Sequence, residues 1–162
     1  MPIVIRRMRT DPDEIEALAR LRHATFFAGS ARTLDVERAE LAEFAQRGAP
    51  QEAGVVAELD GRIAGCCLLV PREIDQQHDH APWLAGLVVE ASMRGCGVGS
   101  ALVHAIEDEA RHRGIPRLFL YTSDAKSFYA ARAWNVLDEF VDSDGEPSTL
   151  MARNLAGKAS PE

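Results

Sequence analysis

Three alternating glycines, Gly95, Gly97 and Gly99, join an apolar segment to an amphipathic one within residues 87–102 (LVVEASMRGCGVGSAL). The first amides of a helix have no partner inside the helix and lie at the positive end of its dipole. A phosphate can approach such amides closely where glycines leave out the Cβ atom, and Arg94 could add a charge-assisted hydrogen bond. The spacing therefore predicts a site for a diphosphate.

Two common nucleotide-binding loops do not match this segment. A Rossmann loop requires G-x-G-x-x-G in an early βαβ unit, but Leu102 stands three positions after Gly99, and an antiparallel hairpin is expected to precede the turn. A Walker A loop requires a lysine after its second glycine, and this segment has none. A glycine-rich turn without a ligand is the remaining alternative.

Hydrophobic periodicity and turn signals predict the elements that position this loop. Strands are expected at 3–7, 53–59, 62–70, 82–89, 117–121, 134–141 and 147–154, with Asp60-Gly61 as a hairpin turn. Helices are expected from Pro12, at 35–47, from about 98 to Gly114, and at 122–133. The inner face of the second helix is expected to carry Val36, Ala39, Leu41 and Phe44. We expect a single α+β domain over residues 1–155 and a mobile tail at 156–162.

Composition excludes several classes of protein. The 162 residues carry a formal net charge of -7, which disfavours a nucleic-acid partner. No apolar run approaches the roughly 18 residues of a membrane span, and the N-terminal segment does not resemble a secretory signal. Three cysteines form no disulfide framework, so we expect reduced thiols and a cytoplasmic location. Two loop histidines without a third ligand predict no metal site.

The pattern Arg94-x-x-Gly97-x-Gly99 resembles the R/Q-x-x-G-x-G/A phosphate loop of the GNAT superfamily of acetyl-CoA-dependent N-acetyltransferases. Residues 127–134 (SFYAARAW) resemble its F-Y-x-x-x-G-F/W element, and the order of elements over 3–154 is similar. The resemblance implies a GNAT-like three-layer fold, with a mixed, mostly antiparallel sheet of about seven strands that is flanked by helices and opens beside Val89. It implies direct acetyl transfer from acetyl-CoA to a primary amine of a small molecule or peptide; a homodimer is left open.

The resemblance also implies roles for individual residues. The backbone of Leu87, Val88 and Val89 would pair with the pantetheine arm. Tyr129 matches a tyrosine near the thioester sulfur, and its phenol could protonate the departing thiolate. Thr122 or Ser123 stands nearest to an asparagine that contacts the cofactor in many relatives. The pyrophosphate would be held by the loop residues Arg94, Gly95, Cys96, Gly97, Val98, Gly99 and Ser100.

The chain departs from the family pattern at two positions. Ala133 replaces a glycine, and a left-handed backbone there would cost an alanine about 1–2 kcal/mol. Trp83 stands where several relatives carry a glutamate base, so the resemblance assigns no base. Histidines suit proton removal from an amine, and we predict that deprotonation runs through water with His80 contributing, although His78-Asp79-His80 could equally be a solvated loop.

The sequence does not identify the acceptor amine. Acidic residues at 73–79 and 138–146 would favour a cationic amine if both segments faced it, but a solvated acidic surface is the alternative. A polyamine, an aminoglycoside, a peptide N-terminus and an amino-acid amine all fit. Ala133 and the missing carboxylate also leave open an acyl-CoA-binding module or sensor without turnover.

Overall fold

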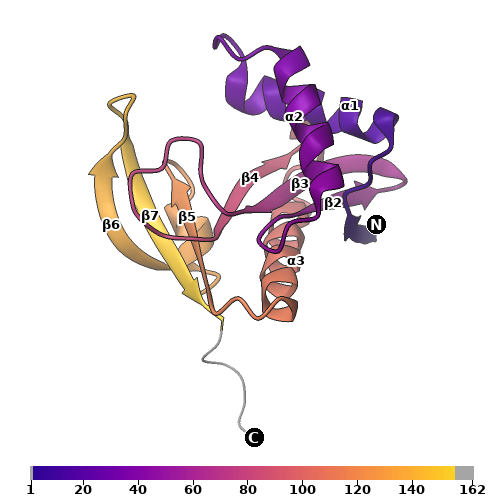
Figure 1. Ribbon diagram of the computed structural model, residues 1–162. Helices are drawn as coiled ribbons and strands as arrows, with labels where there is room; N and C mark the ends of the chain where they lie inside the picture. Colours follow the sequence, from indigo (N-terminus) through magenta and orange to yellow (C-terminus); the bar gives the residue numbers. More distant parts are fainter. Residues whose placement is uncertain (1, 156–162) are drawn as a thin grey trace, which may run out of the picture. The chain divides into compact units, whose positions relative to one another are not determined.

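The computed structural model describes residues 2–155, which form two compact units. The first unit comprises the chain up to residue 68 together with 86–106, and the second comprises 69–85 together with the described chain from 107 onward. The elements, labelled in Figure 1 where there is room, are β1 (Ile3–Arg7), α1 (Pro12–Arg22), the π-helical turn η1 (His23–Phe27), α2 (Leu34–Arg47), β2 (Ala53–Leu59), β3 (Arg62–Val70), β4 (Trp83–Val89), the 3₁₀ turn η2 (Ala91–Met93), α3 (Val98–His112), β5 (Arg117–Thr122), α4 (Lys126–Ala130), β6 (Asn135–Val141) and β7 (Pro147–Asn154).

The strands form one seven-stranded sheet in the order β1-β2-β3-β4-β5-β7-β6. β1 and β2, β5 and β7, and β6 and β7 pair antiparallel, whereas β4 and β5 pair parallel with Trp83 opposite Phe119. The sheet is mixed and mostly antiparallel, which confirms the predicted α+β fold class. An opening of the sheet beside Val89 stays a prediction.

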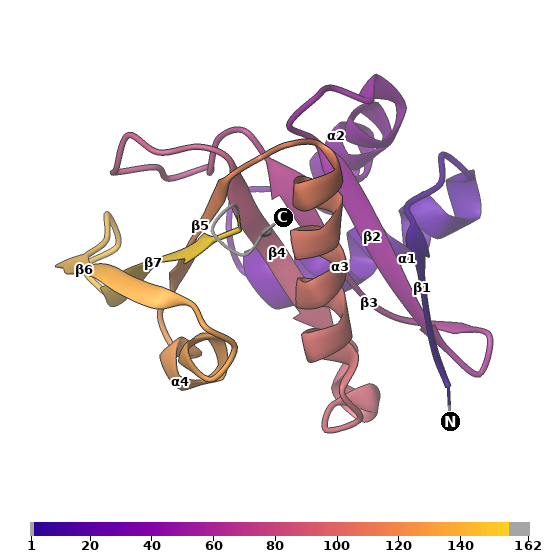
Figure 2. The same ribbon diagram turned by 90° about the horizontal axis from the view of Figure 1, so that it is seen from below.

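The helices α1 and α2 of the first unit have typical capping residues at their ends. Asp11 caps α1 by accepting a hydrogen bond from the amide of Glu14, and Gly48 ends α2 with a left-handed φ of 63°. In the β2–β3 turn, Asp60 and Gly61 have φ values of 55° and 74°, as a tight hairpin requires. α1 and α2 cover one face of β2 and β3, and α3 crosses the opposite face (Figures 1 and 2).

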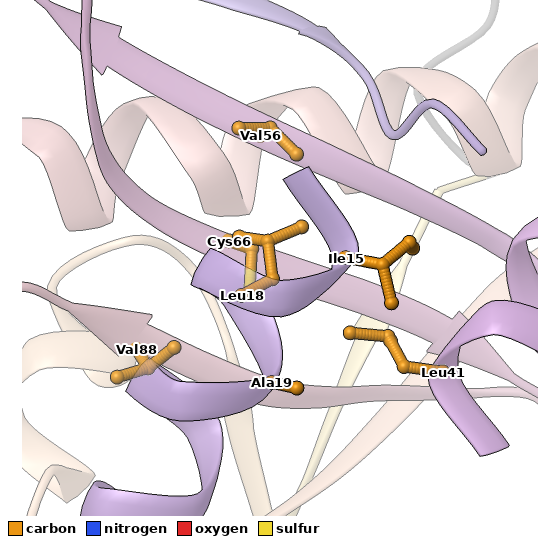
Figure 3. Packing of buried hydrophobic residues seen from close by; sticks show 7 residues of the cluster. All are labelled: Ile15, Leu18, Ala19, Leu41, Val56, Cys66 and Val88. Carbon is orange, nitrogen blue, oxygen red and sulfur yellow. The ribbon is translucent and has the colours of Figure 1, made fainter. Parts of the chain in front are cut away.

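Apolar side chains from both helices and three strands make the core of the first unit (Figure 3). The cluster consists of Ile15, Leu18, Ala19, Leu41, Val56, Cys66 and Val88. Each of these residues is at most 4 % exposed, so the contact of α1 with the sheet excludes water. This packing fixes the end of β4 that precedes the glycine loop.

The predicted inner face of α2 is wrong at two positions. Val36 and Ala39 are exposed, whereas Glu37 and Leu41 are buried. The buried carboxylate of Glu37 pairs with Arg22 and Arg32, so a charged residue occupies an inner position that hydrophobic periodicity assigns to solvent.

The second unit contains β5, β7 and β6 side by side, with α4 preceding β6 (Figure 2). Its core includes Trp83, Phe119, Leu150 and Ala152. α4 spans only Lys126–Ala130, which is shorter than the predicted 122–133. The hydroxyl of Thr122 accepts from the amide of Ala125 and forms a separate turn before the helix, and Ala133, with a φ of 71°, stands in the left-handed conformation after it.

Within residues 2–155, no helix is long and apolar enough to cross a membrane. The same residues contain no cluster of three or more His, Cys, Asp or Glu side chains suited to a metal ion. The predicted tail at 156–162 lies outside the described residues, and the boundaries of a single domain over 1–155 stay a prediction.

Candidate active site

The glycine loop has an open surface above the first turn of α3. Gly95 and Gly97 have left-handed φ values of 80° and 84°. A Cβ atom at Gly95 would meet nothing within 4 Å, and one at Gly97 would meet only a methyl carbon of Ile3 at 3.9 Å. The amide of Ala101 donates to the carbonyl of Gly97 at 3.1 Å, so the loop leads directly into the hydrogen-bond ladder of α3. These residues fit a diphosphate, because the space above Gly95 and Gly97 is open beside the N-terminus of α3.

Arg94 folds back onto the strand that leads to the loop. Its Nε atom donates to the carbonyl oxygen of Val89 at 3.2 Å, while the side chain stays exposed. A carbonyl oxygen has two lone pairs, so Val89 can still accept a second hydrogen bond from a bound ligand. The predicted roles of both residues toward the cofactor are thus compatible with this contact.

Glu90 is a structural cap. Its carboxylate accepts from the amide and hydroxyl of Ser92, and these hydrogen bonds hold the pKa of the Glu90 carboxyl below its usual range. The amide of Glu90 donates to the carbonyl of Ala64 at 2.7 Å and anchors the end of β4 to β3. A carboxylate occupied in this way is a poor candidate for the base.

β4 contains a left-handed glycine that contacts a buried arginine. Gly86 has a φ of 64°, and a Cβ atom there would lie 2.4 Å from Nη1 of Arg22. Arg22 is only 8 % exposed, and its Nε atom lies 2.5 Å from a carboxylate oxygen of Glu37. Neither Arg22 nor Glu37 is among the candidates from sequence. A glycine inside an apolar strand, which often marks a close approach, is the signal that points to this place.

In the second unit, a histidine links a tyrosine to an aspartate. Nδ1 of His78 lies 2.9 Å from the hydroxyl oxygen of Tyr121, and Nε2 lies 2.9 Å from Asp138. The same hydroxyl oxygen accepts from the amides of Gln77 and His78 at 3.0 Å each. Burial raises the pKa of Tyr121, against the opposing effect of these amides. Tyr121 is not a candidate from sequence, because it lies 43 residues from His78.

His80 is held differently. Its ring stacks on Phe119, with centroids 4.2 Å apart and planes inclined by 12°. Its carbonyl accepts from Nε1 of Trp83 at 2.9 Å, and Trp83 itself is fully buried. The ring of His78 thus makes hydrogen bonds to Tyr121 and Asp138, whereas the ring of His80 stacks on Phe119. A contribution of His80 to catalysis stays a prediction.

The residues predicted around the thioester have different degrees of burial. Tyr129 is 6 % exposed, with its ring centroid 5.9 Å from that of Trp134. Its amide donates to the carbonyl of Ala125 at 3.2 Å, so the expected one-turn spacing is present. Thr122 is buried and its hydroxyl accepts from Ala125 at 2.9 Å, whereas Ser123 is exposed. Ser123 is therefore the more accessible hydroxyl of the two.

The two acidic segments come together within the second unit. The hydroxyl of Ser143 donates to Asp75, and Asp138 pairs with His78. Lys126 neutralises part of this charge through Glu139 at 2.9 Å. Residues of the two acidic segments therefore lie close together in the second unit. That this acidic surface faces an acceptor stays a prediction.

A mixed sheet and a glycine loop that leads into a helix are typical of proteins that bind a phosphate-bearing cofactor. Residues 15–135 match the family model described as acetyltransferase (GNAT) family, and the chain belongs to this family. This confirms the resemblance, the predicted class of acetyl-CoA-dependent N-acetyltransferase, and acetyl-CoA as co-substrate.

Solved structures share the fold across almost the whole chain. An aminoglycoside 6'-N-acetyltransferase complexed with coenzyme A has a TM-score of 0.78 at 19% identity, covering 98% of this chain and 99% of its own. The aminoglycoside 6'-N-acetyltransferase from Enterococcus faecium has a TM-score of 0.75 at 19% identity, with the same coverage of 98% and 99%. A Salmonella typhimurium protein described as an acetyltransferase, with its cofactor acetyl-CoA, has a TM-score of 0.74 at 18% identity, covering 100% and 99%. Comparison of the sequence with curated proteins finds no match.

Proposed function

We propose that this protein is a cytoplasmic enzyme that transfers the acetyl group of acetyl-CoA directly to a primary amine of a small molecule or peptide. The observation that carries the proposal is the open glycine loop at the start of α3, with left-handed Gly95 and Gly97 free of covering side chains. Two of the similar solved structures contain coenzyme A or acetyl-CoA, which supports the same ligand here.

Each part of the cofactor has candidate partners in this chain. The amides of residues 94–100 hold the pyrophosphate, and the backbone of 87–89 pairs with the pantetheine arm. Acetyl-CoA supplies an activated acyl group as a thioester. Tyr129 donates a proton to the thiolate, because a phenol is protonated at neutral pH.

The amine must lose a proton before it can attack the thioester. His80, acting through water, is the base predicted from sequence. His78 offers a second route, because its ring joins Tyr121 to Asp138 through hydrogen bonds of 2.9 Å. Such a chain can pass a proton along and hold the ring in one orientation. The pH–rate profiles of the two single alanine variants distinguish these routes.

Release of free thiol from acetyl-CoA, measured with a panel of amines, tests the proposal. The panel includes polyamines, aminoglycosides, amino acids and short peptides. Thiol release that depends on one amine class supports the transferase. Calorimetric binding of acetyl-CoA without thiol release for any amine would instead favour an acyl-CoA-binding module or sensor.

A further inference from the structure

The helix α4 ends in a turn that returns to Tyr129. The amide of Ala133 donates to the carbonyl of Ala130 at 3.2 Å, and the amide of Trp134 donates to the carbonyl of Tyr129 at 3.1 Å. Together with the left-handed φ of 71° at Ala133, these two hydrogen bonds define a Schellman motif. The rings of Tyr129 and Trp134 also lie edge to face, with centroids 5.9 Å apart. The position of Tyr129 is therefore coupled to that of Trp134.

Trp134 is anchored by a buried carboxylate from α3. Its Nε1 atom donates to Oε2 of Glu107 at 3.0 Å. Glu107 is 1 % exposed and Trp134 is 2 % exposed. A carboxylate is costly to bury, and the packing of α3 alone would be served by an apolar residue. The place of Glu107 in the core therefore calls for a reason, and the indole N–H is one of its partners.

Arg153 of β7 holds the other side of the same turn. Its Nε atom lies 3.4 Å from Oε2 of Glu107, an ion pair without the geometry of a hydrogen bond. Its Nη1 atom donates to the carbonyl of Arg132 at 2.7 Å. Glu107 and Arg153 thus hold the residue before Ala133 and the residue after it. An alanine in the left-handed conformation persists where its surroundings fix the backbone in this way.

The helix that carries Tyr129 cannot fix this side chain by itself. α4 spans 5 residues, and so short a helix is not stable without tertiary contacts. A proton donor must lie within hydrogen-bond reach of the leaving group, and a displacement of about 1 Å can cost about 100-fold in rate. The proposed role of Tyr129 therefore depends on contacts outside α4, and the turn held by Glu107 and Arg153 supplies them.

We propose that Glu107 and Arg153 are positioning residues for Tyr129, which they hold through the turn after α4. This inference rests on the proposed role of Tyr129 as proton donor in acetyl transfer. Stability alone does not explain the pair, because replacing a buried ion pair with apolar residues of similar volume is often neutral or stabilising. What apolar residues cannot supply are the hydrogen bonds to the indole of Trp134 and to the carbonyl of Arg132.

Fluorine NMR tests the positioning without turnover. Tyr121 and Tyr129 are the two tyrosines of the sequence, so labelling with 3-fluorotyrosine gives a separate signal for each, and Tyr129→Phe assigns them. The double variant Glu107→Leu/Arg153→Met removes both charges together. In this variant the Tyr129 signal should shift toward its position in the unfolded chain, and the Tyr121 signal should not. An unchanged Tyr129 signal in the folded variant would overturn the inference.

A conservative change keeps the test decisive if the double variant does not fold. Glu107→Gln keeps the shape of the side chain but loses the charge opposite Arg153, and it should still shift the Tyr129 signal. Glu109→Gln is the matched control on the same helix, because the carboxylate of Glu109 pairs with Arg113 at 2.9 Å, and this variant should leave the Tyr129 signal in place. A shift of equal size in the control would mean that the signal reports on α3 in general, which would overturn the inference.

A kinetic double-mutant cycle separates positioning from stability. Glu107→Gln should lower kcat by about 10- to 100-fold, with the affinity for coenzyme A little changed. In the Tyr129→Phe background the same change should lower kcat little further, because its effect acts through the phenol. Equal losses in both backgrounds would show that Glu107 only stabilises the fold.

The combined outcomes keep this inference and the proposed function apart. A Tyr129 signal that moves in Glu107→Gln, although Tyr129→Phe retains the parent kcat, would retain the positioning and reject the phenol as proton donor. The same movement without turnover of any amine would retain the positioning and reject the transferase. Turnover that depends on Tyr129, with an unmoved signal, would retain the transferase and reject the roles of Glu107 and Arg153.

Discussion

The side chain of Arg94 donates from Nε to the carbonyl oxygen of Val89 at 3.2 Å and so joins the glycine loop to the end of β4. The two parts of the chain proposed to bind coenzyme A, the loop and the strand, are thus connected by a side chain as well as by the main chain. Because Arg94 is exposed, this contact can exchange for one with a bound phosphate.

Gly97→Val should abolish measurable binding of coenzyme A and leave the fold intact. A valine at a φ of 84° is strained, and its side chain would occupy the open space above the loop. Isothermal titration calorimetry gives the affinity, and circular dichroism checks the fold. Gly48→Val is the matched control, since Gly48 is equally left-handed with nothing within 4 Å of an added Cβ, but it ends α2. Unchanged affinity in Gly97→Val would mean that the loop does not hold the phosphates.

Arg94→Ala should weaken binding of coenzyme A less than Gly97→Val does, by about 10- to 100-fold, because the backbone amides remain. The affinity of the variant for coenzyme A should depend less on salt concentration than that of the parent, since the lost interaction is electrostatic. A loss as complete as that of Gly97→Val would assign the main phosphate contact to the arginine.

Much of the fold could be predicted because its signals are local. Asp60-Gly61 sets a hairpin turn by its own backbone preferences, and the glycines at 95, 97 and 99 mark the loop within one short segment. The contacts missed from sequence are distant along the chain. Arg22 and Glu37 are separated by 15 residues, and His78 and Asp138 by 60. Hydrophobic periodicity could not predict that Glu37 is buried, because its burial depends on ion pairs with arginines outside its own helix.

Tyr129→Phe should lower kcat by about 10²–10⁴-fold if the phenol protonates the leaving thiolate, with little change in the affinity for coenzyme A. The ring is kept, so packing against Trp134 is retained. The measurement needs pre-steady-state rates under conditions where chemistry limits turnover. A near-parent rate would leave Tyr129 as a core residue, which its burial also allows.

Cys66 should make the protein less stable at high pH. Burial raises the pKa of this thiol to about 11, whereas an unfolded cysteine titrates near 8.5. The folded state therefore retains the proton longer, and stability present below about pH 8.5 is lost as the pH rises toward about 11. Denaturant unfolding gives the free energy of unfolding at pH 8 and at pH 11. The decrease between these two pH values should be smaller for Cys66→Ala than for the parent, by on the order of 2 kcal/mol. The exposed Cys96 is the control, because Cys96→Ala should reproduce the parent's decrease.

Ala133→Gly should stabilise the protein. Ala133 has a φ of 71°, a conformation that costs an alanine about 1–2 kcal/mol, and glycine removes this cost but loses more entropy on folding. The net gain should be about 1 kcal/mol, or an increase in Tm of about 2–4 °C. Ala131→Gly, two residues earlier at the right-handed C-cap of α4, should instead destabilise by up to about 1 kcal/mol. Thermal unfolding of both variants checks the sign. If both variants shift Tm in the same direction, the left-handed backbone at Ala133 is not the source of strain.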